Sequence, residues 1–195
     1  MYRAVLDTCV LVPGGQRDFL LQLAAEGAYA PLWGSGILVE LDYVLTRLDA
    51  QRGRPDSAAD RARLFATMAR AFPGATIDSP KDRAYSYRVN DPDDGHVFHA
   101  ALIGKADALV TDDSRAGFST LADLDAPQIE VVTARQFAAN TVAAHPSAGL
   151  RSLQVMAARL TSPPRSAAEI LDNLTQRYGM SEVATILTPL LTGPR

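Results

Sequence analysis

Four acidic residues stand where the pattern of apolar residues predicts that a strand ends or a helix begins. They are Asp7, Glu40, Asp94 and Asp113. Asp7 closes a short apolar run and Asp113 follows a later one, whereas Glu40 and Asp94 lie early on predicted helices. Because the carboxyl ends of the strands of an open parallel sheet meet at one edge, we expect the four side chains to converge there.

Carboxylates that are packed together repel one another, and without a counter-charge some of them take up protons. A divalent cation removes this conflict, and hard oxygen ligands favour Mg²⁺ or Mn²⁺ over Zn²⁺. The sequence has a single cysteine, Cys9, and no Cys/His cluster with the spacing of a zinc site. The acids therefore predict a site for one or two Mg²⁺ or Mn²⁺ ions.

The elements that must position these acids alternate between strands and helices. Strands are predicted over 4–6, 29–33, 108–111 and 129–132, and helices over 17–26, 35–48, 91–104 and 134–144. A further helix is expected to open at Asp56 or Ser57. This alternation predicts an α/β fold, in which a mainly parallel sheet carries helices on both faces.

Polar residues at the predicted helix starts suit the first turn. Ser35 is expected to cap the helix that carries Glu40. Asp91 is expected to cap the helix that carries Asp94, with Pro92 at its first position. Thr133 and Gln136 have the spacing of a capping box.

The strands stop after His145-Pro146, and the remaining chain reads as helices over 150–160, 167–178 and 181–191. We therefore expect an α/β domain over residues 1–145 and a small all-α extension over 146–195. An apolar stripe indicates that the extension packs on something: Leu171, Leu174, Ile186, Leu187 and Leu190.

The composition fits a soluble protein of one domain with an appendage, since 195 residues include 47% hydrophobic and 21% charged residues. One cysteine cannot form an intrachain disulfide, which fits a reducing compartment. No apolar run approaches the roughly 20 residues of a membrane span. The start of the chain leaves no room for a signal peptide before Asp7. We expect a cytoplasmic protein with no membrane contact.

Four segments resemble, in order and separation across roughly residues 2–138, the motifs of PIN domains. They are Val5–Leu11, Ser35–Glu40, Asp91–Val97 with Ala100-Ala101, and Val110–Asp113. The resemblance implies a three-layer sandwich and a magnesium-dependent endoribonuclease whose acidic site maps onto Asp7, Glu40, Asp94 and Asp113. It further implies that four neighbouring residues support the metal or contact substrate: Thr8, Cys9, Ser35 and Thr111.

Two positions depart from the PIN pattern. Cys9 stands where the family often has Asn or Ser, so it either loosens a hydrogen bond behind the metal ligands or places a thiol near the ion. Asp112 precedes Asp113 and would replace or assist it as a ligand. We favour Asp113, because neighbouring residues at a strand end point in opposite directions.

The residues of the third motif and the helical extension are most similar to the VapC-like branch of the family. This resemblance implies the toxin of a type II toxin–antitoxin pair, with an RNA substrate and a cognate antitoxin. The extension would bind the antitoxin, complete a homodimer or position the substrate. The alternative is a non-catalytic PIN-like module that binds RNA or protein. Arginines between Arg47 and Arg70 indicate either an RNA-facing patch or a solvated helix face.

Overall fold

The computed structural model describes residues 1–53, 57–126 and 128–192. Its chain forms two compact units. The first, which we call the sheet unit, consists of residues 1–12 and 30–132. The second, the helical unit, consists of residues 13–29 and 133–195.

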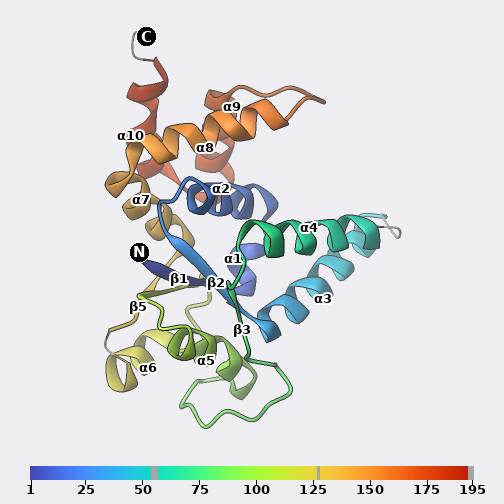
Figure 1. The fold of residues 1–195 in the computed structure, drawn as a ribbon, viewed down its shortest axis with the longest axis vertical. Coiled ribbons are helices and arrows are strands. Elements are labelled where there is room, and N and C mark those ends of the chain that lie inside the picture. Colours follow the sequence, from blue (N-terminus) through green and yellow to red (C-terminus); the bar gives the residue numbers. More distant parts are fainter. Residues whose placement is uncertain (54–56, 127, 193–195) are drawn as a thin grey trace. The chain divides into compact units, whose positions relative to one another are not determined.

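The sheet unit is built on five strands in the order β3-β2-β1-β4-β5, with every neighbouring pair parallel (Figure 1). The strands are β1 (Arg3–Leu6), β2 (Ala30–Gly34), β3 (Thr76–Ile77), β4 (Ala108–Val110) and β5 (Glu130–Val132). Leu6 pairs with Val110, so β1 and β4 end side by side. Their following residues, Asp7 and Thr111, therefore leave the sheet at the same edge. The predicted α/β fold with a parallel sheet is confirmed.

Helices flank this sheet (Figure 1). They are α1 (Thr8–Leu11), α3 (Ser35–Gln51), α4 (Ala58–Ala71), the 3₁₀ turn η1 (Pro92–Asp94), α5 (Gly95–Ile103) and α6 (Phe118–Asp125). Helix α5 packs on β1, β2 and β4. Its buried face includes Val97, Phe98 and Ala101, which anchor the start of the helix beside the strand ends.

The helical unit consists of α2 (Gly14–Ala25), α7 (Ala134–Ala144), α8 (Pro146–Arg159), α9 (Ala167–Tyr178) and α10 (Ser181–Thr192). Helix α8 contacts the other four. Leu171, Leu174 and Leu187 of the predicted stripe are buried, whereas Leu190 is exposed. The expected boundary at residue 145 falls between α7 and α8 and stays a prediction.

Several predicted helix starts are confirmed. Asp91 caps η1 by accepting from the backbone N–H of Asp93. Thr133 caps α7 by accepting from that of Gln136, which is one of the two bonds of the predicted capping box. The expectation for Ser35 is wrong, because Gly34 is the N-cap of α3 and Ser35 is its first residue. Its hydroxyl instead accepts from the backbone N–H of Ser79 at 3.0 Å.

Other elements differ from the prediction. Ser57 precedes α4 without a side-chain cap, and Asp56 lies outside the described residues. Three short elements, α1, β3 and α6, were not expected from the sequence. Over the described ranges, no helix combines the length and hydrophobicity needed to cross a membrane.

Candidate active site

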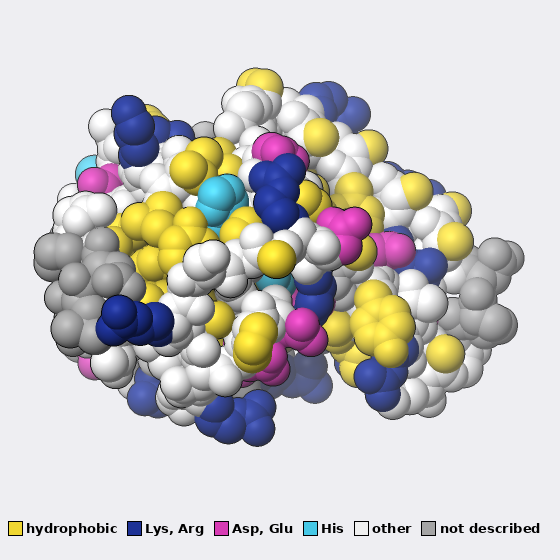
Figure 2. All heavy atoms as spheres, turned by 90° about the horizontal axis from the view of Figure 1, so that it is seen from below, with side chains coloured by type: hydrophobic (Ala, Val, Ile, Leu, Met, Phe, Trp, Pro, Cys, Tyr) yellow, Lys and Arg dark blue, Asp and Glu magenta, His cyan; other side chains and the backbone are white. Residues whose placement is uncertain are grey.

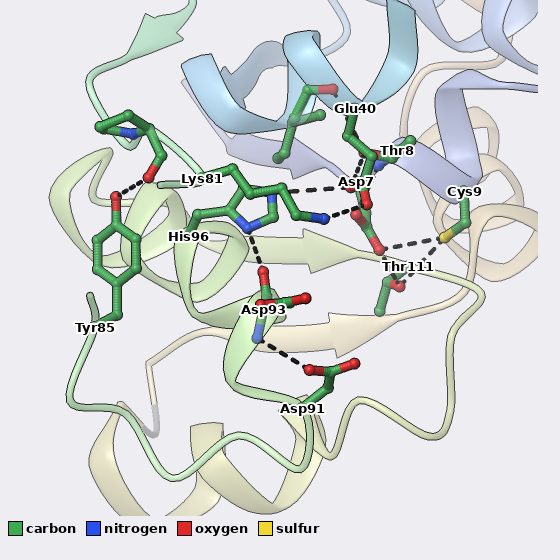
Figure 3. A network of polar contacts seen from close by, with 12 residues as sticks. Asp7, Thr8, Cys9, Glu40, Lys81, Tyr85, Asp91, Asp93, His96 and Thr111 are labelled. Carbon is green, nitrogen blue, oxygen red and sulfur yellow. Dashed lines mark hydrogen bonds and ion pairs between the residues drawn. The ribbon is translucent and has the colours of Figure 1, made fainter. Parts of the chain in front are cut away.

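Asp7 lies at the end of β1, where it caps α1 and is almost completely buried. Its Oδ1 accepts the backbone N–H of Thr8 at 2.6 Å. Its Oδ2 accepts the Thr111 hydroxyl at 2.7 Å and the Cys9 thiol at 3.3 Å (Figure 3). Burial raises the pKa of Asp7, although these three donors act to lower it. The fold therefore holds a carboxylate in one orientation away from water.

Thr8 connects Asp7 to Glu40, which lies on α3. The Thr8 hydroxyl donates to Glu40 Oε2 at 2.8 Å, and Lys81 Nζ donates to Oε1 at 2.8 Å. Burial acts to raise the pKa of Glu40, but the hydrogen bonds from Lys81 and Thr8 lower it overall. Figure 3 shows Lys81 reaching across the front of the site to this carboxylate. Glu40 is therefore ionised, with both oxygens engaged.

Asp94 ends η1 and begins α5, and it lies in the electrostatic field of the other acids. Burial and, to a smaller extent, the negative charges of Asp7, Asp91, Asp113 and Glu40 together raise the pKa of its carboxyl to about 6. Like charges shift a pKa in this way only when they are close. The charges of these four acids, three of which were predicted for the site, therefore act on Asp94. That the four predicted carboxylates hold one ion stays a prediction.

Asp113 joins the network through Thr111. Its backbone N–H donates to the Thr111 hydroxyl at 3.1 Å, and its Oδ1 accepts the backbone N–H of Arg115 at 2.8 Å. Asp112 is exposed, and its backbone N–H donates to Cys9 Sγ at 3.3 Å. Hydrogen bonds of Cys9 thus link Asp112, which follows β4, to Asp7.

His96 is a buried side chain of α5 that points toward Glu40. Its Nδ1 donates to the carbonyl oxygen of Asp93 at 2.8 Å, because a carbonyl oxygen can only accept. Its Nε2 lies 3.9 Å from Glu40 Oε2 and has no hydrogen-bond partner among the described residues. Burial lowers the pKa of the imidazole. Gly36 leaves the space for this ring, since a Cβ there would lie 2.5 Å from His96 Cδ2.

Comparison with protein families gives a match to the PIN domain over residues 3–115, more than half of the chain. The chain belongs to the PIN-domain family. A second match, to the VapC50 C-terminal domain, covers residues 136–189. Together the two matches place the chain, at family level, with the VapC-like toxin nucleases. No curated protein and no solved structure matches the chain.

The residues expected from the sequence have different places in this PIN domain. Hydrogen bonds join Asp7, Thr8, Cys9, Thr111 and Glu40 into one network. The charges of Asp7, Glu40 and Asp113 raise the pKa of Asp94, which is how Asp94 interacts with this network. Ser35 instead holds the segment at Ser79 against the start of α3.

Lys81 and His96 are the site residues that sequence reasoning missed. Lys81 lies in an irregular segment with no periodic pattern. One available signal was chemical: the chain has only two lysines, Lys81 and Lys105, among many arginines.

The donor set of this PIN domain suits a hard divalent cation, because it consists of carboxylate oxygens in a region where negative charge raises the pKa of Asp94. Among residues 1–53, 57–126 and 128–192, no three Asp, Glu, His or Cys side chains are arranged to hold an ion as they stand. Glu40 is bonded to Lys81 and Asp7 to its three donors. Ligation would therefore require local movement of side chains.

Two of the arginines between Arg47 and Arg70 pair with acids. Arg61 bonds to Asp42, Asp49 and Ser57, and Arg63 pairs with Asp60. On the face drawn in Figure 2, Lys and Arg side chains lie scattered among acidic and hydrophobic ones. The side chain of Arg61 is only 15% exposed and its charge is used inside the PIN domain, so this position is neither part of an RNA-facing patch nor solvated.

Proposed function

We propose that the protein is a Mg²⁺- or Mn²⁺-dependent endoribonuclease and the toxin of a type II toxin–antitoxin pair. Its acidic site, formed by Asp7, Glu40, Asp94 and Asp113, hydrolyses RNA phosphodiester bonds. The observation that carries the proposal is the hydrogen-bond network that joins the buried Asp7 to Glu40 through Thr8 and to the backbone of Asp113 through Thr111. Beside this network, burial and the charges of Asp7, Asp91, Asp113 and Glu40 raise the pKa of Asp94 to about 6. Acids whose pKa is shifted by burial and by neighbouring charges are candidates for a functional site, which supports the proposal.

These four carboxylates would hold the ion, with Asp112 as an additional ligand. When bound, the ion activates water for attack and neutralises charge on the phosphorus oxygens. The chain's own part is to orient the acids. Thr111 and Cys9 fix one oxygen of Asp7, and Thr8 fixes one oxygen of Glu40. Rigid placement of this kind reduces the reorganisation that the reaction requires.

The family also supports an RNA substrate and a VapB-type antitoxin as partner. We propose that the antitoxin silences the acidic site until it is removed. A homodimer stays a prediction, and light scattering on the purified chain would test it. A non-catalytic module remains the alternative, and it predicts RNA or protein binding without cleavage.

The decisive experiment compares Asp94→Asn with Asp93→Asn. The two residues are neighbours in η1. Only Asp94 is assigned to the site. Cleavage of a labelled single-stranded RNA should require Mg²⁺ or Mn²⁺ and fall by roughly 100-fold or more in Asp94→Asn, as expected when a charged group acts in the transition state. Asp93→Asn should cleave normally. Equal cleavage by wild type and Asp94→Asn, or cleavage in excess EDTA, would refute the proposal.

A further inference from the structure

The ion pair between Lys81 and Glu40 occupies a carboxylate that the proposed function assigns to a metal ion. Lys81 Nζ lies 2.8 Å from Oε1, while the Thr8 hydroxyl takes Oε2. The side chains are 36% and 26% exposed, so the ammonium borders solvent. A cation approaching Glu40 therefore meets a positive charge already bound there.

The backbone next to Lys81 is fixed against α3, the helix that carries Glu40. The N–H of Gly36 donates to the carbonyl oxygen of Ser79, and the N–H of Ser79 donates to Ser35 Oγ, each at 3.0 Å. A Cβ at Gly36 would lie 2.9 Å from the backbone nitrogen of Lys81. Gly36 and Glu40 are four residues apart and thus share one face of α3. Lys81 therefore cannot leave the vicinity of the acids when its ammonium leaves Glu40.

An anionic substrate must approach this site against the charge of several carboxylates. A lysine ammonium is a common phosphate ligand that acts as a compact point charge. Arg115 also pairs with one of the acids, Asp113, but its side chain is 92% exposed. Lys81 is the basic side chain that bonds to Glu40, and its flexible stem can turn its ammonium from Glu40 to a neighbouring phosphate. Lys81 can therefore bind the carboxylate of Glu40 first and an RNA phosphate afterwards.

The geometry points to Lys81 as a phosphate-binding residue that Glu40 holds in reserve. Glu40 binds the ammonium while the site is empty. When an ion takes Glu40, the ammonium is released to an RNA backbone phosphate. This assignment rests on the proposed function, since it takes RNA as the substrate and Glu40 as a metal ligand.

The assignment predicts opposite effects of one substitution on two ligands. Lys81→Met removes a competitor for Glu40, so Mn²⁺ should bind more tightly in the absence of RNA. In the Glu40→Gln background, where no carboxylate holds the ammonium, the same substitution removes a phosphate contact, so single-stranded RNA should bind more weakly, by roughly two- to fivefold for a partly exposed charge. The slope of log affinity against log salt should also fall by about one.

RNA binding is best measured in EDTA by fluorescence anisotropy of a labelled single-stranded RNA. Four full-length proteins form a double-mutant cycle: wild type, Lys81→Met, Glu40→Gln, and the two changes combined. Glu40→Gln releases the ammonium without an ion, so Lys81→Met should weaken binding more in the Glu40→Gln background than in wild type. If Lys81 only neutralises Glu40, Lys81→Met will reduce the RNA affinity no more in the Glu40→Gln background than in wild type.

Lys105→Met is the matched control, because Lys105 is exposed beyond the far end of α5 from Asp94. It should leave Mn²⁺ binding, measured by titration calorimetry, unchanged. Lys81→Gln provides a second variant should Lys81→Met lose its cooperative thermal transition. An equal or smaller loss of RNA affinity in the Glu40→Gln background, absence of RNA binding, or weaker Mn²⁺ binding by Lys81→Met overturns the assignment. Neither measurement involves cleavage, so failure of the nuclease proposal appears separately, in the Asp94→Asn assay.

Discussion

The hydroxyl of Thr111 donates to Oδ2 of Asp7 at 2.7 Å, across 104 residues of sequence. The bond is possible because β1 and β4 are parallel neighbours, with Leu6 opposite Val110. The same hydroxyl accepts the backbone N–H of Asp113. One small side chain therefore links the carboxylate of Asp7 to the backbone of Asp113.

Replacing Thr111 with Val should destabilise the protein while keeping the shape of the side chain. The buried Asp7 carboxylate loses a donor, and the N–H of Asp113 loses its acceptor, so the expected loss is about 1–3 kcal/mol in the free energy of unfolding. Urea denaturation at pH 7 measures it. Thr111→Ser keeps the hydroxyl and should retain most of the stability. Equal losses in both variants would show that the methyl group, and not the hydrogen bond, matters.

The stability of the metal-free protein should depend on Asp94 over a defined pH range. The pKa of Asp94 rises from 3.8 to about 6 in the fold, so the folded state binds the proton more tightly than the unfolded state. Its contribution to stability is present below pH 3.8 and is lost as the pH rises to about 6. Asp94→Asn should therefore raise the melting temperature at pH 7.5 and change it little at pH 4.

Thermal melts in EDTA from pH 4 to pH 8 test this expectation, with Asp93→Asn as the control. Added Mg²⁺ should raise the melting temperature of wild type at pH 7.5 more than that of Asp94→Asn, because a ligand that binds only the folded state stabilises it. A melting temperature of Asp94→Asn at or below that of wild type at pH 7.5 would contradict the mutual repulsion of the acids.

The sequence predicted those parts of the fold and site that depend on regular elements. The strand over 4–6 was expected and is β1, and the parallel order follows from the alternation of strands and helices. The places of Asp7 and Asp94 followed from this order. By contrast, β3 has two residues and α1 has four, too few for a periodic pattern to be visible.

Ser35 shows why the contacts of the irregular segment around Ser79 and Lys81 could not be predicted from the sequence. Ser is a good N-cap, but here Gly34 takes that place, and the Ser35 hydroxyl bonds to Ser79, 44 residues further along. The same tertiary contact positions Lys81, whose pairing with Glu40 spans 41 residues. Such long-range contacts of an irregular segment leave no local signal in the sequence.

The thiol of Cys9 should react slowly in the folded protein. Burial raises its pKa to about 12, and the charge of Asp7 adds to the rise. At pH 8 roughly one molecule in 10⁴ would then carry the reactive thiolate. Labelling with Ellman's reagent should be slow in buffer and fast in urea. Labelling in buffer at the rate of a free cysteine would contradict the burial. Cys9→Ser should keep the donor to Asp7, whereas Cys9→Ala should lose stability.

Gly36→Ala should disturb the contact between α3 and the site. A Cβ there would lie 2.5 Å from His96 Cδ2 and 2.8 Å from the carbonyl oxygen of Ser79, so both neighbours must shift. Overpacking of this kind costs about 1–3 kcal/mol. Gly14→Ala is the matched control, because the nearest atom there is the end of the Arg17 side chain at 3.4 Å. Since Ala has a higher helix propensity than Gly, Gly14→Ala should leave stability unchanged or raise it slightly.

Urea denaturation of both variants measures the difference. Gly36→Ala should also weaken RNA cleavage, because Lys81 and His96 are displaced. A Gly36→Ala protein as stable as wild type would mean that the segment from Ser79 to Lys81 is not held against α3.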